Sequence, residues 1–198
     1  SCGDQEVFTR EELIKHFSFE NVGKSSAVFN PEKLLWLNSQ YIIKSNPEEL
    51  CEFVIPFLES AGIIQRGQII DRQWLSKAIK TLQERAKTLV ELAKSLRYYI
   101  AEDIVYDEKA KAKLLKEKSL PYLQELTEAI EPGDFSTHEL EAIFKAIVEK
   151  HGIKLGALAQ PARTATTGMA ESPGIFEVFE VLGKQKTLKR LYKAIKII

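Results

Sequence analysis

The sequence predicts an all-α protein, on three observations. Apolar residues recur at the i, i+3, i+4, i+7 spacing of amphipathic helices along almost all of the 198 residues. Most of these segments begin at a residue that caps helix N-termini, and several end at a glycine. No convincing run alternates apolar and polar residues as a half-buried strand does. We expect two helical subdomains, residues 46–107 and 108–198, preceded by a short helical segment, residues 1–45.

The first two parts of the chain carry explicit helix starts. Thr9 to Glu12 forms a capping box, and Asn-Pro pairs at 30–31 and 46–47 begin the next two helices. Asp71 caps a further helix, whose apolar stripe loses register near Arg85. Thr88 then begins a new stripe. These signals predict a helix–turn–helix with Arg85 at its corner.

The third part continues the pattern. A helix rich in Lys, Ala, Leu and Glu follows Asp107, and Ser119-Leu-Pro121 opens another that runs to Ile130. Ser136 caps a helix that Gly152 closes. Residues 156–166 predict a helix of small residues interrupted at Gln160 and Pro161.

Residues 171–183 predict a helix that is fully punctuated. Ser172 is placed as N-cap, Pro173 as first helical residue, and Gly183 as the left-handed residue that ends it. Ile175 begins the apolar stripe, and a last helix follows. Gly174 would leave the backbone N–H groups of the first turn bare, which is either idle capping or a surface for a partner.

Composition restricts the function without naming it. The formal net charge is zero, so no global field indicates a nucleic-acid partner. Locally, residues 72–97 hold seven Lys and Arg against two Glu, and residues 184–198 hold six with no acid. Such basic faces suit phosphate contacts and are equally common as solvated helix faces. The sequence shows neither a signal peptide nor an apolar run long enough for a membrane span, so we expect a cytoplasmic protein.

We predict no catalytic residue and no metal site. The cysteines, Cys2 and Cys51, define no disulfide framework, and the three histidines are far apart in sequence. Gly23-Lys-Ser25 looks like the end of a P-loop, but the motif needs glycine at position 18, which is Ser18. Acidic pairs in first helical turns are explained by the helix dipole.

Three features remain without a structural reason: Arg85, Arg163, and the turn Ser172-Pro-Gly-Ile175. Each also has an ordinary explanation, as a solvated turn residue, a surface helical arginine and a helix cap. Their meaning depends on what else the sequence resembles.

Several blocks of the sequence resemble bacterial glutamyl-tRNA synthetases downstream of their catalytic domain. The blocks are NVGKSSAVFNPEKLLWLNSQYI at 21–42, KLGALAQPARTATTG at 154–168, SPGIFEV at 172–178 and LGK at 182–184. Their order and spacing agree over nearly all of the chain. The resemblance implies the end of a stem-contact region in 1–45, followed by two helical anticodon-binding subdomains.

The resemblance also assigns residues and partners. Arg85 matches the arginine that reads the third anticodon base in discriminating members, which leans this chain towards that type. Arg163, Ser172, Pro173 and Ile175 match positions around the first two anticodon bases. The implied partners are a glutamate-accepting tRNA and a catalytic domain of the same polypeptide, and neither DNA nor a membrane.

The catalytic motifs of the family, HIGH-type and KMSKS-type, are absent from this sequence. The resemblance therefore implies no cofactor within these residues, while ATP and magnesium belong to the full-length enzyme. Whether this chain is itself part of an enzyme stays open. The alternative function is an all-helical protein-interaction domain whose basic faces meet an acidic partner.

Overall fold

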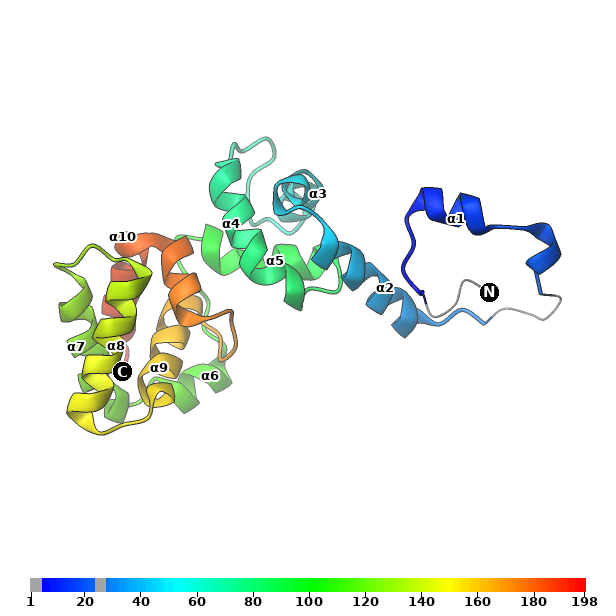
Figure 1. Ribbon diagram of the computed structural model, residues 1–198. Helices are drawn as coiled ribbons and strands as arrows, with labels where there is room; N and C mark the ends of the chain where they lie inside the picture. Colours follow the sequence, from blue (N-terminus) through cyan, green and yellow to red (C-terminus); the bar gives the residue numbers. More distant parts are fainter. Residues whose placement is uncertain (1–4, 24–27) are drawn as a thin grey trace.

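The computed structural model describes residues 5–23 and 28–198, and these residues form helices and connecting loops without any strand. An N-terminal arm carries three helical elements: α1 (Arg10–His16), η1 (Phe19–Asn21) and α2 (Pro31–Lys44). In Figure 1 this arm extends away from the rest of the chain, to which α2 connects it. Most of the P-loop-like stretch falls on residues 24–27, outside the described residues.

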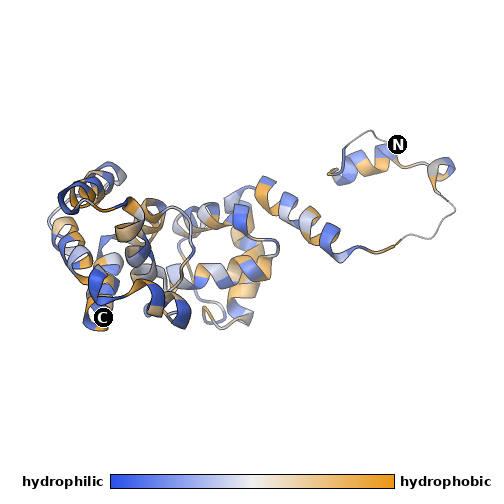
Figure 2. Cartoon of the chain, turned by 90° about the horizontal axis from the view of Figure 1, so that it is seen from below, coloured by the Kyte–Doolittle hydropathy of each residue, from blue (hydrophilic) through white to orange (hydrophobic). Residues whose placement is uncertain are grey.

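The N-terminal arm has little core of its own. None of the residues of α1 is buried, and many large apolar side chains of the arm are exposed. Figure 2 shows hydrophobic residues along the arm as well as between the packed helices. The arm is closed by Tyr41, whose hydroxyl donates to the Phe8 carbonyl over 2.6 Å, and by a 2.9 Å ion pair between Lys33 and Glu6.

The N-terminal core is built by the helices that follow. They are α3 (Pro47–Ser60), α4 (Arg72–Leu82), η2 (Gln83–Arg85) and α5 (Leu89–Ile100). The apolar stripes of α3, α4 and α5 face one another, and Leu58, Leu75 and Leu96 are fully buried where they meet. The predicted corner at Arg85 is confirmed, because α4 ends in η2 and Thr88 caps α5 by accepting from the Glu91 N–H.

The C-terminal core holds the remaining elements. They are α6 (Glu108–Leu114), η3 (Glu117–Ser119), α7 (Leu120–Ile130), α8 (Thr137–His151), α9 (Leu155–Thr167) and α10 (Ile175–Lys196). Its centre includes Leu126, Phe144 and Phe179, all buried. The two cores divide along the chain between Ile104, which packs on the first, and Tyr106, which packs on the second.

The first half of α10 belongs to both cores. Ile175 and Phe179 are buried in the C-terminal core, whereas Val178, Val181 and Leu182 pack into the N-terminal one. The indole N–H of Trp74 adds a hydrogen bond of 2.8 Å to the Val181 carbonyl. Gly183, with φ 74° and ψ 161°, breaks the helical path and divides α10 into two helices. The predicted break at Gly183 is therefore confirmed.

Two helix predictions were wrong in detail. α9 runs without interruption through Pro161, which loses one backbone hydrogen bond but is buried among the small residues of the C-terminal core. Burial in the core offsets the local penalty. The N-cap of α10 is Gly174 instead of Ser172, and the first helical residue is Ile175 instead of Pro173. No helix of the described residues combines the length and hydrophobicity that a bilayer crossing requires.

Candidate nucleic-acid interface

A cavity of about 410 Å³ lies where the two cores meet. One wall comes from the end of α4, from η2 and from α5, and the other from the last residue of α9 and the segment after it, residues 167–173. The segment 101–105 between the cores completes it. The residues that line it are Leu82, Arg85, Lys94, Ser95, Arg97, Tyr98, Ala101, Asp103, Ile104, Val105, Thr167, Met169, Glu171, Ser172 and Pro173. The predicted residues Arg85, Ser172 and Pro173 thus meet in one place.

Arg85 stands exposed at the rim of this cavity. The turn that carries it is anchored on the N-terminal arm, since the Gln83 side-chain N–H donates to the Ile43 carbonyl over 3.0 Å. Asn38 likewise donates to the Lys87 carbonyl. Within the described part of the chain, the Arg85 guanidinium takes part in no hydrogen bond and no ion pair. Its five N–H donors are therefore available to a ligand.

Arg163, on α9, is half-buried and is not among the residues that line the cavity, although it lies close enough to Arg85 and Tyr98 for their charges to interact. Burial lowers the pKa of its guanidinium, and the positive charge of the nearby Arg85 lowers this pKa further, against smaller opposing effects of Tyr98 and Glu171. Its Nε–H is buried without an acceptor among the described residues. Two arginines that repel each other, one of them with an unused donor, favour a ligand rich in acceptors or negative charge.

Tyr98 is a residue that the sequence interpretation missed. It is only 9% exposed, packs within the N-terminal core and lines the cavity. Burial raises the pKa of its hydroxyl strongly, and the neighbouring Tyr99 contributes to this shift. The hydroxyl has no partner within the residues described, and the charges of Arg85 and Arg163 both act on it. Its place close to both arginines follows from the meeting of the two cores, which helix periodicity does not show.

The turn that precedes α10 differs from its prediction in a way that matters for ligands. Ser172 is buried, and its hydroxyl donates to the Pro173 carbonyl over 2.9 Å instead of capping the helix. The Gly174 N–H is occupied, because it donates to the Glu177 carboxylate over 3.1 Å. Ile175 is 5% exposed and faces the C-terminal core, so the structure does not bring it to the cavity.

A second groove adjoins the cavity and encloses about 600 Å³. Its lining holds three cations, Lys77, Lys80 and Arg85, and three carboxylates, Glu84, Glu177 and Glu180. Arg85 and Pro173 line both hollows, so the groove and the cavity are continuous. Five of the seven cations in residues 72–97 line one hollow or the other; they are Lys77, Lys80, Arg85, Lys94 and Arg97.

Exposed lysines and arginines beside a partly apolar cavity are features by which RNA-binding modules hold phosphates and unstacked bases. Residues 49–195 match the family described as the anticodon-binding domain. The chain belongs to this family of anticodon-binding domains, to which its two helical cores correspond.

The most informative relatives are curated bacterial proteins and a solved structure. The glutamate–tRNA ligase of Thermodesulfovibrio yellowstonii is 50% identical over 196 residues, which is 98% of this chain and 42% of that protein. The ligase of Geobacter sulfurreducens is 46% identical, over 98% of this chain and 41% of its own length. A crystal structure of the glutamate tRNA ligase from Elizabethkingia meningosepticum superimposes with a TM-score of 0.80 at 27% identity. That match covers 94% of this chain and 36% of the ligase. The chain thus spans about two fifths of these relatives.

Proposed function

We propose that this chain recognises the anticodon of a glutamate-accepting tRNA and serves a glutamate–tRNA ligase. The observation that carries the proposal is the convergence of Arg85, Ser172 and Pro173 on one cavity, with Arg163 close enough for its charge to act on Tyr98 in the cavity wall. These residues are far apart in sequence and come from two separate cores. The similarity to glutamate–tRNA ligases of known name supports the choice of tRNA.

The chemistry of the cavity suits a base that has left the stack of the anticodon loop. A guanidinium offers paired donors to the O2 and N3 acceptors of cytosine and a flat face for stacking. Arg85 is the residue we assign to the third anticodon base, which is cytosine in glutamate anticodons. Leu82, Tyr98 and Ile104 give the cavity the apolar surface on which a base face rests.

The lysines of the groove beside the cavity would bind the neighbouring phosphates. Lys77 and Lys80 lie on the outer side of α4, on the path that leads to Arg85. Contacts of this kind add affinity without reading sequence, and salt weakens them. The two hollows therefore have separate roles, since the groove holds the backbone and the cavity distinguishes the base.

Binding of the 198-residue chain to a tRNA transcript tests the proposal. Filter binding compares the glutamate-accepting tRNA with transcripts altered at each anticodon position, at two salt concentrations. We expect altered anticodons to bind more weakly, and salt to weaken all transcripts in parallel. Equal affinity for every anticodon would refute specific recognition and favour a surface for an acidic protein partner.

We also propose that the ligation itself takes place in a catalytic domain of the same polypeptide, which would bind glutamate, ATP and magnesium. Supporting this, the curated relatives are more than twice as long as the part that this chain matches. The 198-residue chain alone should bind tRNA yet form no glutamyl-tRNA when given glutamate, ATP and magnesium. Detectable aminoacylation would contradict the assignment of ligation to a separate catalytic domain.

A further inference from the structure

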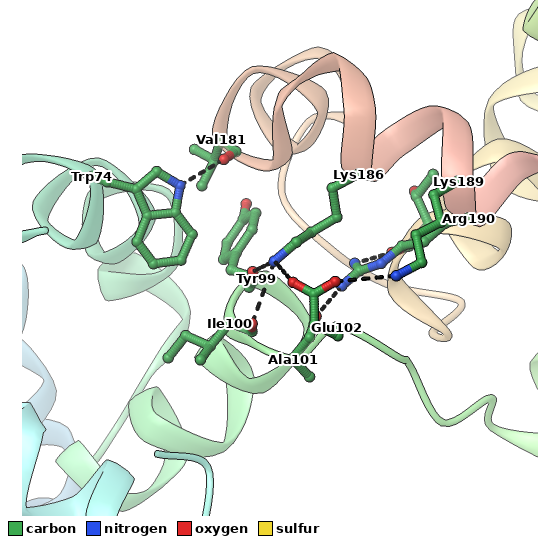
Figure 3. A network of polar contacts seen from close by, with 10 residues as sticks. Trp74, Tyr99, Ile100, Ala101, Glu102, Val181, Lys186, Lys189 and Arg190 are labelled. Carbon is green, nitrogen blue, oxygen red and sulfur yellow. Dashed lines mark hydrogen bonds and ion pairs between the residues drawn. The ribbon is translucent and has the colours of Figure 1, made fainter. Parts of the chain in front are cut away.

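The second half of α10 carries a row of cations on one face. Lys186, Lys189, Arg190 and Lys193 follow the i, i+3, i+4, i+7 spacing that places side chains together on a helix. From the sequence alone this face suited RNA phosphates. The structure instead turns it towards the end of α5 and the residues that follow, as Figure 3 shows.

The lysines of this row bind backbone carbonyls at the end of α5 and carboxylates of the segment between the cores. The Lys186 ammonium donates to the carbonyls of Tyr99 and Ile100 at 3.1 and 3.3 Å. Lys189 pairs with Glu102 at 3.1 Å, and Lys193 pairs with Asp103 at 2.7 Å. The last carbonyls of a helix lack partners within it and carry partial negative charge. Cations of the C-terminal core therefore cap a helix of the N-terminal core.

Arg190 lies at the centre of the row and is only 2% exposed. Its Nη1 donates to the Thr166 carbonyl and its Nη2 to the Ala101 carbonyl, both at 2.6 Å. Burial lowers the pKa of its guanidinium to about 10. A buried charge of this kind adds little net stability, because desolvation opposes its hydrogen bonds. The planar guanidinium instead holds the two carbonyls at a fixed separation.

One of these carbonyls belongs to a residue that lines the cavity, and the other to the residue directly before a lining residue on α9. Ala101 lines the cavity and lies three residues after Tyr98. Thr166 lies three residues after Arg163 and directly before Thr167, which also lines the cavity. A second link runs in parallel, from the Asp107 N–H to the Gly168 carbonyl at 2.9 Å.

We propose that Arg190 is a positioning residue, which sets the spacing between Arg85 and Tyr98 on one side of the cavity and Thr167 and Ser172 on the other. It thereby determines how well the cavity distinguishes one base from another, without contacting RNA. This inference rests on the proposed function. Loss of Arg190 should change the discrimination between bases, which is due to the cavity, and leave unchanged the affinity that is due to the groove.

Two substitutions of Arg190 test this role. Arg190→Lys keeps the charge but offers a single ammonium, which cannot hold both carbonyls in the same geometry. Arg190→Met fills much of the same space without any donor. Lys196→Met is the matched control, because Lys196 is an exposed cation at the end of the same helix and forms no hydrogen bond or ion pair within the described residues. Each variant is titrated with the glutamate-accepting tRNA transcript and with a transcript carrying guanine as third anticodon base.

We expect both Arg190 variants to lower the ratio of the two affinities by about tenfold, the size of one well-made base contact. Affinity for the guanine transcript should stay within about twofold of the unchanged chain, since the groove is untouched. Hydrogen exchange gives a readout without RNA: the Asp107 amide should exchange faster in both Arg190 variants, while the Leu96 amide in the N-terminal core is unchanged. The Lys196→Met chain should behave as the original.

An unchanged affinity ratio in both variants, or a parallel loss for both transcripts, overturns the proposal. If circular dichroism shows that the Arg190 variants fail to fold, Lys186→Met replaces them. This substitution removes the neighbouring contacts of the same row with the end of α5, and the same affinity ratio is measured. If the unchanged chain itself binds both transcripts equally, the proposed function fails. In that case, unchanged exchange at Asp107 in the Arg190 variants would also refute the positioning role, and faster exchange would uphold its structural part.

Discussion

Replacing Gly168 by alanine should damage the junction of the two cores more than an ordinary glycine substitution at a helix end. Gly168 ends α9 with φ 80°, and a Cβ there would lie 2.3 Å from the Val105 carbonyl oxygen. That neighbour is backbone, so no side chain can turn aside to relieve the clash. The matched control is Gly152→Ala. Gly152 ends α8 with φ 59°, and a Cβ there would meet nothing within 4 Å.

The magnitudes follow from these two geometries. The left-handed conformation alone costs a residue with a Cβ about 1–2 kcal/mol, and this applies to both sites. At Gly168 the Val105 carbonyl must also move, which disturbs the hydrogen bond from the Asp107 N–H to the Gly168 carbonyl, worth about 1 kcal/mol. We therefore expect a loss of about 1 kcal/mol for Gly152→Ala and about 2–4 kcal/mol for Gly168→Ala.

Urea unfolding followed by circular dichroism measures the free energy of unfolding of both variants beside the original chain. Because both glycines end helices of the C-terminal core, the same transition reports on both. Val105 also lines the cavity, so Gly168→Ala should weaken binding of the glutamate-accepting transcript while Gly152→Ala leaves it unchanged. Losses of stability that agree within about 0.5 kcal/mol would show that the Val105 contact carries no cost.

Three further predictions concern single residues. Arg85→Gln should reduce the preference for cytosine over guanine as third anticodon base by about 1–3 kcal/mol in a tRNA binding titration, and an unchanged preference would remove Arg85 from that role. The hydrogen bond with His151, then the one with Lys150, holds the pKa of the Glu125 carboxyl below its ordinary value of 4.5. The ionised Glu125 carboxyl therefore contributes fully to stability above pH 4.5, and this contribution is lost as the pH falls through the lowered pKa. In the Glu125→Gln chain the urea midpoint should fall less steeply with decreasing pH than in the original chain. An equally steep fall would contradict this. Burial raises the pKa of the Cys51 thiol. In a Cys2→Ser chain, Cys51 should therefore react only slowly with a thiol reagent until urea unfolds the N-terminal core. Immediate reaction of the folded chain would be inconsistent with that burial.

The helices could be predicted because most of their boundaries depend on a few neighbouring residues. Asn30, Asn46, Asp71 and Ser136 accept hydrogen bonds from the first turns that they were expected to cap. Where the prediction was wrong, distant packing was responsible. Pro161 stays within α9 because the surrounding core covers it, a circumstance that local propensity does not record.

The candidate site was predictable only in part, for a related reason. Arg85 and Ser172 have no structural role that the sequence pattern explains, and they meet at the cavity. Tyr98 could not be predicted, because its place near both Arg85 and Arg163 follows from the meeting of the two cores. The basic run of residues 184–198 was equally misleading, since a charge pattern does not reveal whether the charges face solvent or the carbonyls of another helix.

The sharing of α10 between the two cores has a consequence for how the chain unfolds. Val178 and Val181 complete the N-terminal core although they lie more than seventy residues beyond its last helix. Melting of the C-terminal helices would withdraw both side chains and leave Leu75 and its neighbours open to water. Thermal denaturation should therefore couple the two cores in one cooperative transition. A chain cut after residue 107 should be less stable than its own helices suggest, because part of its hydrophobic interior is encoded elsewhere.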